Sequence, residues 1–412
     1  MGVPFNQGFT AFCYRLHQWI GEMHLLFATS IVPDGALASG YEIANAAIIE
    51  ALRRAGVRVT VIGFSWPGKP AADPENTIVL GAIDVRTESA SPRQKLAWVG
   101  KAMRTGLTFA SVKLRVVSAA DVRAAIERAG PFDGYVLNSV QFAGAFDGVF
   151  GDRPSIFVAH NVEHRSAEEN AAAAGSVLQR WLFRREARLL EVMEKRLCRA
   201  ARFVFTLAEE DRAALGVASD DRSAVLPLVT RAEGPANKDP RRVDCDAALI
   251  GTWTWQPNRI GLDWFLTKVA PHLRPDFRIR IAGNMPSGVT STHSGIQFAG
   301  RVPDAQAFVR GGAVVPLIST AGSGVQLKTI ETFELGLPSV ATSRSLRGIG
   351  YRPQNCVVTD DPVAFAAALE AAAADVRDVD GSAFHRRQVR ALDTAVRLGL
   401  EKLGVVRQGV AA

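Results

Sequence analysis

The sequence predicts an α/β protein with two doubly wound, Rossmann-like domains. Its 412 residues are enough for two domains with separate cores. In both halves, short apolar runs alternate with segments of helical periodicity, which is the pattern of parallel sheets built from βαβ units. Glycine-bearing turns and polar residues follow several of these runs. Because ligands bind beyond the carboxyl ends of such strands, we expect these segments at a cleft across which the two domains face each other.

The first domain is predicted at residues 23–230, after an N-terminal extension of residues 1–22. A glycine-bearing loop at 34–40 leads into a helix at 41–54, and residues 168–201 are expected to be mostly long helix. Strands are expected at 24–30, 57–64, 135–138, 155–159 and 203–207.

A polar linker follows at residues 231–246, where Gly234, Pro235 and Pro240 interrupt any apolar periodicity. The second domain is predicted at 247–380 and includes an Ala-rich helix at 362–374. The C-terminal segment 381–412 holds a last helix of about 382–403. Strands of this domain are expected at 247–251, 278–282, 295–298, 313–318, 339–341 and 356–358.

Composition narrows the class of protein. Hydrophobic residues make up 48% and charged residues 22% of the chain, as in ordinary globular proteins. Four scattered cysteines without a C-x-x-C pair argue for a reducing compartment and against a zinc or disulfide framework. No apolar run is long enough for a membrane-spanning helix, and no signal-peptide pattern is present. A cytoplasmic protein is therefore expected.

The net charge of +7 points to anionic partners. The densest basic stretch runs from Arg180 to Arg202, with Glu186, Glu191 and Glu194 interleaved. This stretch is either a solvated helix with i,i+4 ion pairs or a surface attracted to anionic lipid headgroups. Nucleic acid is not expected as a partner, because no nucleic-acid-binding signature is present.

The extension of residues 1–22 carries large apolar side chains at roughly helical spacing. Three interpretations stay open: an interfacial amphipathic helix at a membrane, a helix packed on the first domain, or a mis-assigned start, since Met23 directly precedes the first strand. The apolar positions are Phe5, Phe9, Phe12, Leu16, Trp19 and Ile20.

The most informative motif begins at Gly322. Gly322 and Gly324 permit a tight turn after a buried strand, and a helix is expected from Lys328 to Leu335. A glycine turn that opens a helix presents backbone N–H groups and the positive end of the helix dipole to an anion. Lys328, one helical turn in, adds a full charge, and Glu331 would meet whatever the anion is attached to. A phosphate carrying a hydroxylated sugar satisfies these features; an ordinary strand–turn–helix with a solvated Lys and Glu is the alternative.

This segment resembles the donor-site motif of the group 1 (family 4) glycosyltransferases of GT-B fold, in the subgroup with a glycine-rich G-x-G-x-x-L-K-x-x-E pattern. The similarity covers about residues 23–370. It includes residues 251–258 (GTWTWQPN), 282–284, 300–302 and 157–164 (FVAHNVEH). The resemblance implies a C-terminal helix that crosses back to the first domain, and transfer of a sugar from a nucleotide diphosphate.

In the second domain, the resemblance assigns the ribose hydroxyls to Glu331. Backbone N–H groups and a cation can stabilise a departing diphosphate, so no metal or other cofactor is expected beside the nucleotide sugar. The remaining candidates for donor binding are Gly251, Asn258, Gly283, Asn284, Arg301, Val302, Gly322, Ser323, Gly324 and Lys328.

In the first domain, Gly35 and Gly40 suit a loop close to the transferred sugar and the acceptor. His160, Asn161 and Glu163 follow a predicted strand, where polar side chains fit a cleft edge. The resemblance makes His160 an active-site residue, so the predicted catalytic residues are His160, Lys328 and Glu331.

Several alternatives concern the chemistry of these residues. Glu163 is a candidate general base for an inverting reaction, whereas the resemblance implies retention, with the leaving phosphate taking the acceptor's proton. A zinc site at His160 and His164 lacks a third ligand. Asp244 and Asp246 spell D-x-D, the metal-binding signature of the other large glycosyltransferase fold, and are interpreted as solvated loop.

Two positions depart from the family pattern. Ser323 stands where the broader family often has Glu, and Gln326 stands where the subgroup usually has Arg. The second departure removes a cation and leaves Lys328 with more of the diphosphate to neutralise.

The resulting prediction is a retaining hexosyltransferase that moves a sugar to a saccharide or lipid-linked acceptor in exopolysaccharide or surface-glycan biosynthesis. It is expected in the cytoplasm, peripheral at an anionic inner membrane face. The alternatives are a non-catalytic GT-B scaffold that binds nucleotide or glycan, and a sugar-nucleotide epimerase on the same fold.

Overall fold

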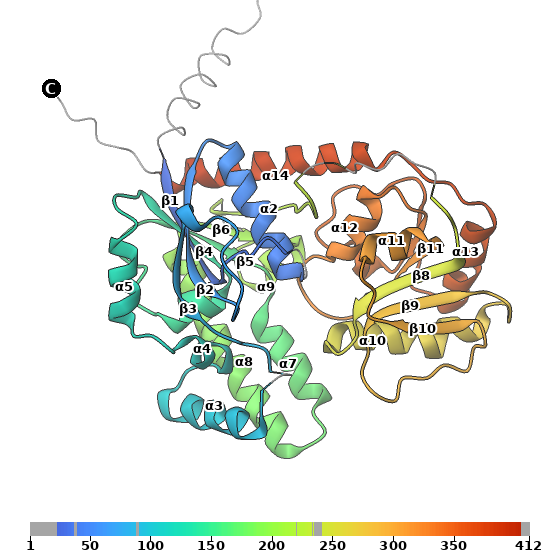
Figure 1. The fold of residues 1–412 in the computed structure, drawn as a ribbon, viewed down its shortest axis with the longest axis horizontal. Helices are drawn as coiled ribbons and strands as arrows, with labels where there is room; N and C mark the ends of the chain where they lie inside the picture. Colours follow the sequence, from blue (N-terminus) through green and yellow to red (C-terminus); the bar gives the residue numbers. More distant parts are fainter. Residues whose placement is uncertain are drawn as a thin grey trace, which may run out of the picture. The chain divides into compact units, whose positions relative to one another are not determined.

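The computed structural model describes residues 23–36, 39–87, 90–219, 221–232, 234 and 241–404, so the predicted extension of residues 1–22 lies outside it. The chain divides into two compact units. One unit comprises Met1–Leu226 with Ala391–Ala412, and the other comprises Pro227–Arg390. Each unit contains its own parallel sheet (Figure 1). The division falls just before the polar segment expected to be a linker.

The first unit contains a sheet of seven parallel strands in the order β3-β2-β1-β4-β5-β6-β7. The strand order reverses between β1 and β4, which makes the crevice beyond their carboxyl ends the expected ligand position. The strands are β1 His24–Ile31, β2 Arg58–Ser65, β3 Thr77–Ala82, β4 Gly134–Asn138, β5 Ser155–Ala159, β6 Phe203–Thr206 and β7 Ser223–Val225.

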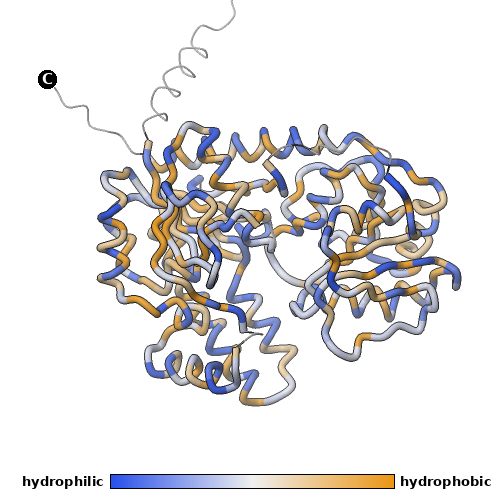
Figure 2. Tube along the Cα trace, viewed as in Figure 1, coloured by the Kyte–Doolittle hydropathy of each residue, from blue (hydrophilic) through white to orange (hydrophobic). Residues whose placement is uncertain are grey.

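Helices connect these strands. Strands β4 and β5 are buried throughout their length, as expected for central strands covered on both faces, and Figure 2 shows the hydrophobic colours concentrated in this part of the unit. The helices are α2 Gly40–Arg54, α3 Pro92–Thr105, α4 Phe109–Leu114, α5 Ala119–Glu127, α6 Val140–Ala145, α7 Glu163–Ala173, α8 Val177–Ala200 and α9 Glu209–Ala214, with the 3-10 turn η1 Pro74–Asn76.

The segment 168–201, predicted to be mostly long helix, is mostly helical. A turn around Gly175 divides it into the end of α7 and the whole of α8. Ser176 is the N-cap of α8 and its side chain accepts a hydrogen bond from the Gln179 backbone N–H. Glycine followed by a capping serine favours a new helix start over continuation.

The second unit contains a sheet of six parallel strands in the order β10-β9-β8-β11-β12-β13. Here the strand order reverses between β8 and β11. The strands are β8 Cys245–Thr252, β9 Ile279–Asn284, β10 Ile296–Gly300, β11 Gly312–Leu317, β12 Ser339–Ala341 and β13 Cys356–Val358. The helices are α10 Gln256–Trp264, α11 Ala305–Arg310, α12 Leu327–Glu334 and α13 Pro362–Ala374, with the short turns η2 Phe265–Val269, η3 Ala270–His272 and η4 Ser343–Leu346. The predicted class, two doubly wound parallel sheets, is confirmed.

The last helix, α14 Gly381–Leu403, begins in the second unit and ends in the first. Its residues Leu392, Val396 and Leu400 are buried. Gly399 lies so close to β6 that a Cβ there would be 2.6 Å from the Phe205 ring. The C-terminal half of α14 therefore completes the core of the first unit.

The D-x-D pattern lies at the start of β8, so its interpretation as solvated loop is wrong for Asp246. Asp246 accepts a 2.7 Å hydrogen bond from the Arg278 backbone N–H. Because ligands bind at the opposite, carboxyl end of the strand, its role is to pair two strand starts. Within the described residues, none of the helices combines the length and the apolar composition that a bilayer span requires.

Candidate functional site

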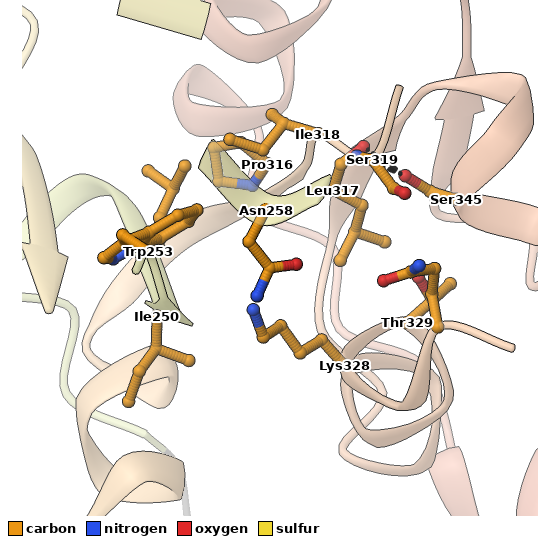
Figure 3. Close-up of a pocket in the computed structure, with 12 residues that line it drawn as sticks. Ile250, Trp253, Asn258, Pro316, Leu317, Ile318, Ser319, Lys328, Thr329 and Ser345 are labelled. Carbon is orange, nitrogen blue, oxygen red and sulfur yellow. Dashed lines mark hydrogen bonds between the residues drawn. The ribbon is translucent and has the colours of Figure 1, made fainter. Parts of the chain in front are cut away.

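A pocket lies at the switch point of the second unit's sheet. Its walls come from the ends of β8 and β11 and from the segment that starts α12 (Figure 3). The lining residues are Leu249, Ile250, Trp253, Asn258, Pro316, Leu317, Ile318, Ser319, Gln326, Lys328, Thr329 and Ser345.

The glycine turn before α12 has the backbone that its residues predict. Gly322 and Gly324 have φ values of +90° and +75°, which only glycine adopts without strain. The side chain of Arg344 holds this turn, because its Nη2 donates a 2.7 Å hydrogen bond and its Nε a 3.2 Å hydrogen bond to the Gly322 carbonyl. With that carbonyl engaged by Arg344, the turn is fixed in one orientation.

Lys328 is the second residue of α12, because the helix begins one residue before the predicted start. Its ammonium lies 5.1 Å from the centre of the Trp253 ring, and its side chain points toward the amide of Asn258 (Figure 3). The N-cap residue Gln326 forms no side-chain hydrogen bond to the first turn. No described carboxylate lies within ion-pair distance of the Lys328 ammonium. The start of α12 therefore offers positive charge that no side chain neutralises.

Burial lowers the pKa of Lys328 to about 8, although the charge of Glu331 acts in the opposite direction. Desolvation disfavours the ammonium form of a lysine because water no longer solvates the charge. An anion bound beside Lys328 would restore that lost solvation.

Two glycines shape the wall beside this ammonium. A Cβ at Gly251 would lie 2.9 Å from the Lys328 Nζ and 2.8 Å from the Trp253 ring, so only hydrogen fits there. Gly283, with φ +115°, packs its own backbone on Gly251, where a Cβ would lie 1.8 Å from the Gly251 carbonyl oxygen. Gly283 thus supports the strand pair β8–β9. Asn284 donates a 3.3 Å hydrogen bond to the Thr254 hydroxyl.

Glu331 lies outside the pocket lining, one turn further along α12. Its Oε1 accepts a 2.9 Å hydrogen bond from the Gln306 side chain on α11. Burial raises the pKa of Glu331, while the Gln306 hydrogen bond and the charges of Arg231 and Lys328 lower it. Arg301 and Val302, two of the donor-binding candidates, lie just before α11, so Gln306 connects Glu331 to that part of the unit.

In the first unit, a polar network spans the switch point between β1 and β4. Asn138, the last residue of β4, donates to Thr29 Oγ1 of β1 at 3.4 Å and to Asn45 Oδ1 at 2.6 Å. Its Oδ1 accepts a 2.8 Å hydrogen bond from His160 Nε2, just after β5. The Tyr41 hydroxyl bonds Thr29 at 2.7 Å, and its ring lies 5.2 Å from the His160 ring.

Burial determines the charge of His160, and its hydrogen bond within this network determines which ring nitrogen carries the proton. Burial lowers the pKa of His160 to about 4, so the imidazole is neutral at physiological pH. Because Asn138 Oδ1 can only accept, the proton of the neutral ring resides on Nε2. Ser139, which follows Asn138, has φ +69°, a left-handed backbone that is costly for a residue with a side chain. Such strain is characteristic of functional sites.

Glu163 and His164 open α7 near His160. Burial raises the pKa of Glu163, and the Asn161 amide donates to its Oε1 at 3.3 Å. The buried Glu194 accepts hydrogen bonds from the Glu163 backbone N–H at 2.7 Å and from the His164 ring at 2.5 Å. His164 therefore pairs with Glu194, away from His160. Among the described residues, no group of three metal-ligating side chains is found.

The structure thus brings Gly251, Asn258 and Lys328 together at one pocket of the second unit, beside the turn of Gly322 and Gly324. His160, Asn161 and Glu163 share one edge of the first unit's sheet. Gly35 has φ +84° in the loop after β1, and Gly40 is the first residue of α2. Residues that the sequence did not single out are Thr29, Tyr41, Asn138, Gln306, Ser345 and Arg344.

Comparisons with known proteins agree with this architecture. The structure of TarM is similar over 93% of this chain and 99% of that one, with a TM-score of 0.57 and 10% sequence identity. Anabaena Alr3699/HepE in complex with UDP and glucose is similar over 92% of this chain and 98% of that one, with a TM-score of 0.53 and 13% identity. The same protein in complex with UDP has a TM-score of 0.50 and 15% identity over the same shares of the two chains. No curated protein matches the sequence.

The chain therefore has the fold of the GT-B glycosyltransferases. Residues 246–375, which hold the pocket and α12, match the family model described as glycosyl transferases group 1. The second unit is accordingly similar to the group 1 glycosyltransferases.

Proposed function

We propose that the pocket of the second unit binds the diphosphate of the nucleotide sugar. The observation that supports this most strongly is the environment of Lys328. Its ammonium is partly buried over the Trp253 ring, next to Gly251, without a carboxylate partner among the described residues. A buried cation without a partner is costly, and a bound anion would offset that cost.

The same residues suit the chemistry of transfer. Negative charge builds on the diphosphate as the bond to the sugar breaks, and catalysis requires positive groups already in place. Lys328 supplies a charge, and the glycine turn with the start of α12 supplies backbone N–H groups. In this proposal, Gly322, Ser323 and Gly324 form the glycine-rich turn that is typical of the G-x-G-x-x-L-K-x-x-E subgroup of these enzymes. Glu331 binds the ribose hydroxyls.

The polar edge of the first unit is the proposed acceptor side. His160 is neutral, with its Nε2 proton engaged by Asn138, so it acts by hydrogen bonding. Asn161, Glu163, Gly35 and Gly40 border the sugar and the acceptor hydroxyl. The reaction is retaining: the leaving phosphate takes the proton of the acceptor hydroxyl on the face where the new bond forms.

The donor is proposed to be a uridine diphosphate sugar, because the similar structure HepE holds UDP and glucose. The acceptor is a saccharide or a lipid-linked saccharide at the inner face of the cell membrane, for an exopolysaccharide or another surface glycan. The positive net charge of the chain supports a location near anionic lipid.

Replacement of Lys328 by alanine tests the site. Lys328→Ala should weaken UDP binding by about 1–3 kcal/mol, the range for a lost charged hydrogen bond. Isothermal titration calorimetry with UDP and GDP measures this loss and identifies the base. The matched control is Lys268→Ala, which removes an exposed lysine of the same unit. Equal UDP affinity in Lys328→Ala and the parent protein would contradict the proposal.

A further inference from the structure

One exposed face of α8 combines basic and large apolar side chains. Val177, Trp181, Arg184 and Arg188 recur at spacings of four, three and four residues, so they point to the same side of the helix. The exposed fractions of Val177 and Trp181 are 81% and 55%, and that of Leu178, beside them, is 66%. Three large apolar side chains within five residues are thus exposed to water beside a row of arginines.

The acidic residues of α8 do not neutralise this face. Glu186 and Glu194 are 8% and 1% exposed and point into the unit, where they accept hydrogen bonds from the Phe109 and Glu163 backbone N–H groups. Glu191 pairs with Lys195 at 2.6 Å. Arg184 and Arg188 have no ion-pair partner in the part of the chain that the structure describes. The i,i+4 ion pair expected of a solvated helix thus forms further along α8, at Glu191 and Lys195, whereas the arginines beside Trp181 carry none among the described residues.

Helix α3 extends the same surface. It lies beside the first turns of α8 at the bottom of the first unit in Figure 1, and the Arg185 side chain donates to the Ala102 and Leu107 carbonyls. Its fourteen residues include four Lys or Arg and no Asp or Glu, and only Ala102 is buried. Leu96 is 72% exposed. The acidic residues Glu168 and Glu169 belong to α7, which precedes α8 in the chain.

We propose that the exposed face of α8, extended by α3, docks on a bilayer that contains anionic lipid. The arginines meet the headgroups, while Val177, Leu178 and Trp181 enter the interface between headgroups and acyl chains. A nucleic acid would match the charge but leave these apolar side chains unused. The inference rests on the proposed membrane-held acceptor and names the surface that brings the enzyme to it.

Vesicle co-sedimentation of the full chain tests this surface. The protein should partition to vesicles of phosphatidylcholine with roughly 30% phosphatidylglycerol and not to vesicles of pure phosphatidylcholine. Each basic residue near such a surface contributes about fivefold, so Arg184→Gln/Arg188→Gln should lower partitioning about 25-fold. Trp181→Ser should lower it about tenfold through lost apolar burial. Raising NaCl should release the parent protein, because salt screens the attraction.

Two control proteins separate a local effect from total charge or hydrophobicity. Arg128→Gln/Arg397→Gln removes two exposed arginines elsewhere on the first unit, and Val363→Ser removes an exposed apolar residue of the second unit. Both should partition like the parent protein. Equal binding of the parent to both lipid mixtures, parent-like binding of the Arg184/Arg188 variant, or binding of an RNA oligonucleotide in place of vesicles would overturn the proposal. UDP affinity, measured in parallel, reports separately on the donor site.

Discussion

At the residue scale, Lys328 occupies a position where its charge is sensitive to pH. Water is partly replaced around the ammonium by the Trp253 ring, the Gly251 backbone and the pocket wall. The resulting pKa of about 8 lies within reach of ordinary assay conditions, whereas that of a solvated lysine does not. The ligand affinity of the pocket should therefore follow the titration of this one side chain.

UDP binding is expected to weaken as pH rises through about 8. Only the protonated form of Lys328 attracts the diphosphate, and for a pKa of about 8 the protonated fraction falls about tenfold between pH 7 and pH 9. The dissociation constant should rise by about the same factor, measured by calorimetry in buffers of equal ionic strength.

The control for this titration is Lys328→Arg. A guanidinium stays charged over the whole range, so the affinity of this variant should not change between pH 7 and pH 9. A parallel decline in both proteins would show that another group causes the pH dependence.

The sequence predicts those features of the candidate site that come from residues close together in the chain. Gly322, Gly324 and Lys328 are recognisable because a turn, a helix start and a charge follow one another along the chain. It missed Arg344, whose contact with the Gly322 carbonyl joins residues 22 positions apart. It also missed Asn138, because only the order of strands in the sheet places β4 beside β1 and β5. Such contacts depend on topology and leave no local pattern.

At the element scale, the carboxylate of Glu186 places an unfavourable buried charge where α8 packs against the start of α4. Glu186 accepts a 2.8 Å hydrogen bond from the Phe109 backbone N–H at the start of α4, but its other carboxylate oxygen is buried without a hydrogen-bond partner in the structure described. Burial raises the pKa of Glu186 to about 7. Between its ordinary pKa and 7, the folded state therefore binds more protons than the unfolded state, and stability falls as pH rises.

Glu186→Gln is expected to stabilise the first unit above neutral pH. The amide oxygen can still accept from the Phe109 N–H, while the cost of the buried charge disappears, for a gain of about 1–3 kcal/mol at pH 8. Urea unfolding at pH 8 and pH 4.5 measures the difference. The gain should vanish at pH 4.5, where the parent carboxyl is already protonated; an equal gain at both values would assign the effect to packing.

Some elements were predicted with the observed bounds, and others were missed. Strands β5, β12 and β13 and helix α13 have the predicted bounds. Strand β3 was missed because it lies at the sheet edge and is largely exposed, so it lacks a clear apolar run. Helices α4 and α6, of six residues each, are shorter than two turns and show too little periodicity to identify.

At the scale of the whole molecule, the chain returns to its first unit after building the second. Residues of α14 after Arg390 group with the first unit. The amphipathic pattern of this helix predicts a helix with one buried face, but the pattern alone does not say which core that face covers. The crossing was implied by family resemblance, and the contact of Gly399 with Phe205 identifies the partner strand as β6.

The stability of the first unit should therefore depend on the C-terminal half of α14. Leu400 is 3% exposed in α14, so Leu400→Ala should destabilise the first unit by about 2–4 kcal/mol through lost burial and a cavity. Leu398→Ala is the matched control, since Leu398 is 39% exposed on the same helix and its loss should cost less than about 0.5 kcal/mol. Hydrogen exchange followed by mass spectrometry resolves the effect by segment. Faster exchange is expected in β6, with β11 and β12 unchanged; faster exchange confined to β11 and β12 would mean that α14 stabilises the second unit instead.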